Sequence, residues 1–174
     1  MRFNRMNMQK LSAVQAVTTA LTLAASILSG AASAAPPPSK AACNTTLQAA
    51  LVTNLNFGDF EGTVAGSVIV DTAGNRSTTG PVLAGGTVSE AAYDVWNNQA
   101  GCERRNITVT VPASITLAGP ATMVANNFTK NPAGKFKLTA PGVPTRVSVG
   151  ATLNSTAGQT NGAYTVPFSV QFNH

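Results

Sequence analysis

Histidine is almost absent from this chain, because the only one among 174 residues is His174, the last residue. A catalytic triad or a Cys–His pair needs a base held rigidly against its nucleophile, and chain termini are usually poorly ordered. We therefore expect His174 to be exposed and to have no function. The lack of a second histidine argues against hydrolases that use this side chain as their base.

Acidic residues are also few, since Asp and Glu together number six. Two carboxylates suffice to hydrolyse a glycosidic bond, but nothing marks any pair here. Asp59 and Glu61 lie close together, yet calcium usually takes about six to eight oxygen ligands. No glycine-rich loop leads from a strand into a helix to bind phosphate. The sequence therefore predicts a protein that is not an enzyme and that has no cofactor or metal.

Residues 1–34 have the features of a cleaved export signal. Three basic residues precede an apolar stretch over residues 11–28, and small residues occupy positions 32–34. The competing interpretation is a membrane anchor, but polar residues dilute the apolar stretch, which is thin for a span of about 20 residues. We expect cleavage after Ala34, passage through the periplasm, and a final place at the cell surface or outside the cell, without membrane contact.

The basic excess of the chain is smaller than it first seems. There are 11 Lys and Arg residues, but three of them lie in the expected signal, which leaves eight against six acidic residues. Lys135 and Lys137 flank Phe136 at strand spacing, as residues on a solvated face or a protected edge do. Binding to nucleic acid relies on basic residues that neutralise several phosphates. We expect no nucleic-acid partner.

Cysteine occurs only twice, at Cys43 and Cys102. In an exported chain this number favours one disulfide between them. A metal site is the competing interpretation, but two cysteines without a CxxC pair or a nearby histidine are poor ligands. Residues 35–42, APPPSKAA, lie between the signal and Cys43, and three consecutive prolines favour a polyproline spacer. The remaining residues, 43–174, form the expected domain.

Alternating apolar and polar residues dominate this domain, and no stretch has a convincing apolar stripe at the helical period of about 3.6 residues. A period of two indicates strands with one buried face. It occurs around Leu47, Ala49 and Leu51, and in residues 67–71, 107–111, 146–153 and 164–172. We also expect a turn within residues 54–60, where Gly58-Asp59 offers a turn or a bulge, a hairpin turn at residues 73–76 and a break at Gly85-Gly86. The sequence predicts an all-β, immunoglobulin-like antiparallel β-sandwich with Greek-key connections.

Pro167 lies inside the longest alternating run and removes one backbone donor from it. Either it marks a local bulge, or the last strand, with Val166, Phe168 and Val170, borders an open edge where another chain can pair. Four aromatic residues also have two interpretations. They form a sugar-binding platform, or, more in keeping with a chain that is only 6% aromatic, they pack in the core. These four are Tyr93, Trp96, Phe128 and Phe136.

Several short motifs resemble a family of bacterial exported domains of unknown function, over residues 54–173. They are Leu55-Asn56-Phe57-Gly58, Gly74-Asn75-Arg76, residues 83–93 and 107–112, Asn126-Asn127-Phe128 and residues 162–166. Members of this family resemble fimbrial subunits of chaperone–usher systems and spore-coat-protein-U-like pilins. The resemblance implies a structural subunit of a surface appendage, whose partners are other pilin-like subunits, a periplasmic chaperone and an usher.

Such pilins are incomplete sandwiches, completed by a strand from a neighbour or a chaperone. Leu47, Ala49 and Leu51 have the alternation of a donated strand, but a bond from Cys43 to Cys102 would tie the start of that strand to its own domain. Whether residues 43–51 complete this domain or a neighbouring one stays open at this point. The alternative function is a free-standing secreted or surface β-sandwich module that binds a glycan or a protein ligand.

Overall fold

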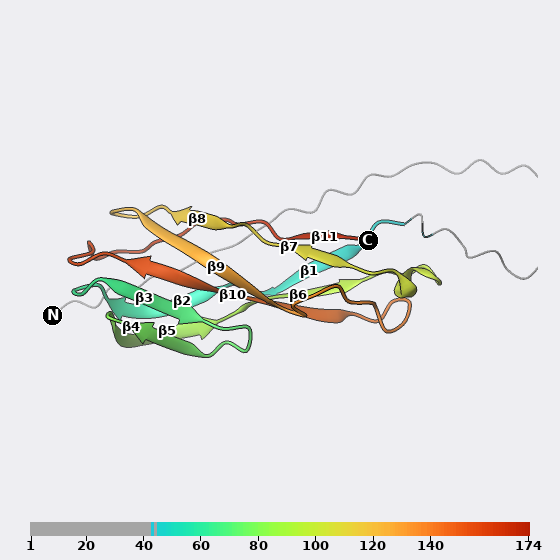
Figure 1. Ribbon diagram of the computed structural model, residues 1–174, viewed down its shortest axis with the longest axis horizontal. Coiled ribbons are helices and arrows are strands. Elements are labelled where there is room, and N and C mark those ends of the chain that lie inside the picture. The colour runs from blue at the N-terminus through green and yellow to red at the C-terminus, as the bar shows by residue number, and fades with distance from the viewer. Residues whose placement is uncertain (1–42, 44) are drawn as a thin grey trace, which may run out of the picture.

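The computed structural model describes Cys43 and residues 45–174, so the expectations for residues 1–34 and 35–42 lie outside the described residues. The described chain is all-β with antiparallel sheets, one of which is curled into a half-barrel (Figure 1). The predicted all-β class is therefore confirmed. No helix within the described residues is long and apolar enough to span a membrane.

Eleven strands and one short 3₁₀ helix make up the regular structure of the described chain. In chain order they are β1 (Gln48–Thr53), β2 (Asn56–Glu61), β3 (Gly66–Val70), β4 (Arg76–Thr79), β5 (Val82–Ser89), β6 (Ala91–Trp96), η1 (Cys102–Arg104), β7 (Thr108–Thr110), β8 (Ser114–Leu117), β9 (Met123–Asn131), β10 (Thr145–Ser155) and β11 (Gln171–Asn173).

The largest sheet is built around β10, its longest strand. The first half of β10 pairs with β6 and the second half with β3, while β9 pairs with β10 from Ser148 to Asn154. Strand β1 extends the sheet beyond β6, β4 extends it beyond β3, and β8 pairs with β9. All of these pairs are antiparallel. Because β10 is central, even its polar Ser148 is buried.

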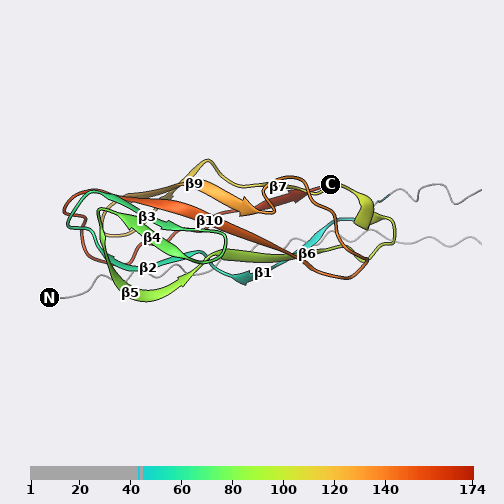
Figure 2. The same cartoon turned by 60° about the horizontal axis from the view of Figure 1, so that its bottom comes forward.

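Two further sheets have two strands each, β2 with β5 and β7 with β11. Figures 1 and 2 show the arrangement from two sides: β2, β3, β4 and β5 gather at one end of the elongated molecule, and β1, β6 and β7 lie towards the other end, near η1 and the C terminus. The core lies between the sheets, and each alternating strand contributes the apolar side chains of one of its faces to it. Its largest fully buried side chains include Tyr164, Phe57, Phe60, Leu55, Ile107 and Leu117.

Of the turn or bulge expected at Gly58-Asp59, the turn is wrong, because residues 56–61 form β2, and the bulge is confirmed by the register shifts beside Asp59. The predicted break at Gly85-Gly86 is also wrong, since both glycines lie inside β5. These two strands pair with register shifts on either side of Asp59, and Gly58 has φ 70°. Glycine serves here to let the backbone adopt a positive φ within a bulge, not to end a strand.

The predicted hairpin turn at residues 73–76 is confirmed in position, because β3 and β4 pair across it. The Asp71 carboxylate accepts hydrogen bonds from the backbone N–H groups of Ala73 and Asn75, both at 2.8 Å, and from the Asn75 side chain at 3.0 Å. These bonds lower the pKa of Asp71, with the side-chain bond from Asn75 as the largest cause. Aspartate thus fixes this turn through its own side chain.

Tyr164 is fully buried, and its hydroxyl donates to the Thr160 carbonyl at 2.6 Å and accepts from Gln159 Nε2 at 2.9 Å. We expect Tyr164→Phe to lower the free energy of unfolding by about 2 kcal/mol, because the change leaves two partly buried polar groups without their partner. Urea unfolding followed by fluorescence measures this loss. A Tyr164→Phe protein as stable as wild type would contradict a structural role for the hydroxyl.

Candidate functional site

The first feature at the end of the molecule near the C terminus is the disulfide between Cys43 and Cys102, which confirms the sequence prediction. Their Cα atoms are 5.1 Å apart and their side chains are buried. His174 is exposed, as predicted, and its Nε2 lies 3.5 Å from Cys43 Sγ. Through this contact between Cys43 and His174, the start of the described chain lies beside its end.

Asn97 adds a hydrogen-bonded anchor next to the disulfide. This side chain is 1% exposed. Its Nδ2 donates to the carbonyls of Thr45 and Thr46 at 3.3 and 3.4 Å, and its Oδ1 accepts from Thr45 Oγ1 at 3.0 Å and from the Gln99 backbone N–H at 2.8 Å. A buried amide with all these partners satisfied fixes the chain just before β1.

Strand β1 belongs to its own domain. It pairs with β6 from Gln48 opposite Trp96 to Thr53 opposite Ala92. Leu47, Ala49 and Leu51 are half-buried and pack against the core of the same chain. The question left open by the sequence is thus answered for this structure: these residues complete their own sheet and are not held out as a free arm.

The outer edge of β1 has no ladder partner among the described residues, since β1 is the end of its sheet. Edge strands are commonly protected against pairing by charged residues or by proline. Residues 45–53, TTLQAALVT, contain neither. The exposed backbone of β1 therefore lacks the usual protection.

The last residues of the chain form the second border of the same core. Their inward side is apolar at every second residue, as predicted: Tyr164 and Phe168 are buried, while Val166, Val170 and Phe172 are half-buried against the core. Phe168 packs on Phe128, with ring centroids 5.6 Å apart.

The predicted continuous strand over residues 164–172 is only partly formed. Thr165 bridges Ala118, and β11 pairs with β7, but residues 166–170 make no backbone hydrogen bond to any other described residue. Pro167 lies within this stretch and has no N–H to donate. We call the outer edge of Leu47 and β1, together with residues 166–172, the open border. It includes all six residues predicted for strand assembly.

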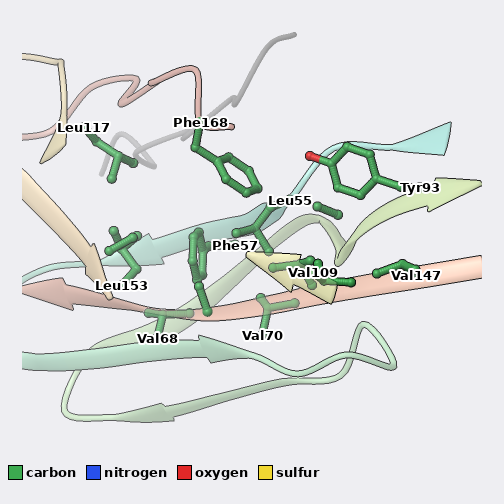
Figure 3. Close-up of a cluster of buried hydrophobic side chains, with 14 of the residues drawn as sticks. Leu55, Phe57, Val68, Val70, Tyr93, Val109, Leu117, Val147, Leu153 and Phe168 are labelled. Atoms are coloured by element: carbon green, nitrogen blue, oxygen red, sulfur yellow. The ribbon is translucent and has the colours of Figure 1, made fainter. Parts of the chain in front are cut away.

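Tyr93 connects the two parts of the open border. It lies on the inner face of β6, opposite Leu51 of β1 and Val147 of β10, and its ring centroid is 5.6 Å from that of Phe172 in β11. Figure 3 shows its hydroxyl turned towards the side of the cluster where Leu55 and Phe168 lie. The residue is 7% exposed, and its hydroxyl has no hydrogen-bond partner among the described residues. Burial raises the pKa of Tyr93 to about 12.

The aromatic residues do not form one platform. Tyr93 and Phe136 are buried, and Phe128 packs on Phe168, which confirms core packing for these three. Trp96 is half-buried. It lies on the opposite face of β6 from Tyr93, because the two residues are three positions apart and successive side chains of a strand alternate between its faces. Within the described part of the chain, no three His, Cys, Asp or Glu residues gather as a metal site would require.

Two residues of this region could not be assigned from the sequence. Asn97 lies in a polar stretch, Asn97-Asn98-Gln99, with no pattern that distinguishes it from its neighbours. Tyr93 was predicted as a core residue, which is confirmed, but the missing partner of its hydroxyl depends on strands that are distant in sequence. Only the assembled sheet reveals either feature.

A family model described as "Domain of unknown function (DUF4402)" matches residues 45–174. The chain therefore belongs to this family, whose function is unknown. Among curated proteins and among solved structures, nothing matches the chain.

Proposed function

We propose that this member of the DUF4402 family is a non-enzymatic structural subunit of a bacterial surface appendage, which assembles by strand complementation. In this proposal the subunit accepts an extended strand from another polypeptide at its open border. The observation that carries the proposal is residues 166–170, which have inward apolar side chains like a strand but no backbone partner among the described residues.

The backbone of the open border supports strand addition. An extended peptide that joins an exposed edge gains affinity from main-chain hydrogen bonds and specificity from alternate side chains. Both parts of the border offer free N–H and C=O groups, one along the outer edge of β1 and one along residues 166–170. A strand lying between them satisfies groups that otherwise bond only to water.

The side chains support it as well. Leu47, Ala49 and Leu51 on one part, and Val166, Val170 and Phe172 on the other, are only partly buried although they pack on the core. An added strand with apolar residues at every second position would remove this surface from water, which is the main favourable term in association.

The finer fold belongs to the same proposal. We propose that the domain is an immunoglobulin-like sandwich with Greek-key connections that lacks one strand. Tyr164 supports this, because a tyrosine whose hydroxyl bonds to the backbone a few residues upstream is typical of such sandwiches. Here the bond from Tyr164 to the Thr160 carbonyl spans four residues.

The structure changes which residues we expect to donate. Cys43 and residues 45–53 are tied to their own domain by the disulfide, by Asn97 and by β6. We therefore place Leu47, Ala49 and Leu51 on the accepting side, together with Val166, Phe168 and Val170. The donated strand then comes from another pilin-like subunit or, during transit through the periplasm, from a chaperone.

The test uses the exported protein purified without a partner and an uncharged peptide of about ten residues in which Val alternates with Thr. We expect the peptide to bind and to raise the melting temperature, because it binds only the folded state. Val170→Lys, which places a charge on the inward side of the border, should weaken binding at least tenfold.

Ser169→Lys is the matched control, since Ser169 is exposed and points away from the core. It adds the same charge one residue away and should leave binding unchanged. Val170→Thr serves as a milder variant where Val170→Lys does not fold. A wild-type protein that remains a monomer and binds neither the peptide nor any chaperone would count decisively against the proposed function.

A further inference from the structure

We infer that the Tyr93 hydroxyl is the polar anchor of the open border: it donates a hydrogen bond to the incoming strand and so selects strands that present an acceptor at that position. This inference rests on the proposed function and names the partner's chemistry. The partner is an uncharged, extended segment of another polypeptide, with apolar side chains at alternate positions and a carbonyl or hydroxyl oxygen facing Tyr93.

The state of the Tyr93 hydroxyl is the first argument. Buried polar groups almost always have a hydrogen-bond partner, and each exception calls for an explanation. Tyr164 follows the rule, since its hydroxyl donates to Thr160 and accepts from Gln159. The Tyr93 hydroxyl is also buried but has no partner in the part of the chain that the structure describes. A hydroxyl without a partner in the free protein can donate to an acceptor that another chain brings.

Position is the second argument. Tyr93 is opposite Leu51 of β1, and its ring contacts Phe172 of β11. It therefore lies between the two segments that form the open border. Strands β1 and β11 are each at the end of their sheet among the described residues, so a strand can add next to Tyr93 at either edge.

The ionisation of Tyr93 suits a donor. Because burial raises the pKa of this phenol to about 12, the group stays protonated at any physiological pH. An anionic group on the partner is not needed, and a carbonyl oxygen of a strand backbone is the acceptor that strand insertion brings closest.

Charge identifies the partner. Residues 45–53 and 164–173 contain no Lys, Arg, Asp or Glu, so neither part of the border offers a counter-ion to a charged strand. A charged side chain buried there would remain unpaired, which is strongly unfavourable. The residues that precede the domain, APPPSKAA, are a poor strand for a second copy to donate, because three prolines lack an N–H and no apolar side chain except proline exceeds alanine in size.

The test compares Tyr93→Phe with Tyr164→Phe in the exported protein, using the Val/Thr peptide and a second peptide in which Lys replaces the Val residues. For Tyr93→Phe we expect an unchanged or higher melting temperature, because an unsatisfied hydroxyl is removed. We also expect about fivefold to tenfold weaker binding of the Val/Thr peptide, which is the loss of one hydrogen bond. Tyr164→Phe should lower the melting temperature and keep the affinity. The Lys peptide should not bind.

Different outcomes separate the two ideas. Equal affinity of wild type and Tyr93→Phe for the Val/Thr peptide overturns the role of Tyr93 but leaves strand capture intact. If wild type binds no peptide at all, the proposed function itself fails. If wild type instead self-associates and Tyr93→Phe weakens that association, the occupant is a second copy, and the inference of a different partner chain is overturned.

Discussion

Replacing Cys43 and Cys102 together by alanine is expected to lower the free energy of unfolding by about 4 kcal/mol. The bond joins residues 59 apart in sequence, and a cross-link over a loop of that length restricts the unfolded chain by roughly this amount in the chain-entropy model. Both side chains are buried, and because alanine is apolar, the replacement introduces no unsatisfied polar group there. Urea unfolding of the disulfide-bonded protein, with and without a thiol reductant, measures the effect.

The reductant provides the control for this prediction. It should lower the stability of wild type to that of the double-alanine variant and should leave the variant unchanged. A further expected result is local: without the bond, β1 is held at its start mainly by Asn97, so its amide hydrogens should exchange faster than those of β10. A loss below about 1 kcal/mol would mean that residues near Cys43 stay ordered without the cross-link.

This prediction matters for the proposed function because the disulfide decides which side of the assembly β1 belongs to. While Cys43 is bonded to Cys102, residues 45–53 cannot leave the domain as a donated arm without breaking their pairing to β6. The tie keeps Leu47, Ala49 and Leu51 in place as one part of the open border. From the sequence alone, Leu47, Ala49 and Leu51 could belong either to their own domain or to a donated arm. The register of β1 against β6 decides for their own domain.

Strands with strict alternation could be predicted from sequence alone. Residues 146–153 have apolar side chains at every second position, and Val147, Val149, Ala151 and Leu153 are buried in β10. The short run SVIVD likewise became β3, with Val68 and Val70 buried. In such runs the side chains to be buried and the period of the backbone agree, so local and long-range preferences favour the same structure.

Prediction failed where glycine has a role that depends on distant residues. Gly85 and Gly86 looked like a chain break and Gly58 like a turn or a bulge, yet all three lie in a bulged pair of strands, β2 and β5. In this pair Arg76, from a different strand, bonds to backbone carbonyls. Nothing near Gly58 in the sequence indicates that a guanidinium from β4 will lie against it.

The site was predictable only in part for a similar reason. Alternation identified Val166, Phe168 and Val170 as inward residues, and Pro167 suggested an interruption. That residues 166–170 lack backbone partners depends on how β7, β8 and β11 pair, which no local pattern contains. The unsatisfied hydroxyl of Tyr93 depends in the same way on Leu51, Val147 and Phe172, from three other strands.

Arg76→Met should lower the free energy of unfolding by about 3 kcal/mol. Arg76 Nη1 donates to the carbonyls of Phe57 and Asp59, both at 3.1 Å, and to that of Gly85 at 2.9 Å. Hydrogen bonds from a charged donor are stronger than those between neutral groups, and their loss leaves three backbone carbonyls at the bulge without this partner. Methionine keeps much of the apolar stem, so the change tests the guanidinium and not the packing. Thermal and urea unfolding measure the loss.

Arg104→Met is the matched control, because it removes the same charge from an arginine whose side chain is 87% exposed and pairs with Glu103 at 3.5 Å. An exposed ion pair contributes little, so this variant should stay within about 0.5 kcal/mol of wild type. Arg76→Lys should fall between the two, since a lysine ammonium carries the charge but lacks the planar guanidinium that reaches these carbonyls. Equal stabilities of Arg76→Met and Arg104→Met would mean that the bulge between β2 and β5 forms without the arginine.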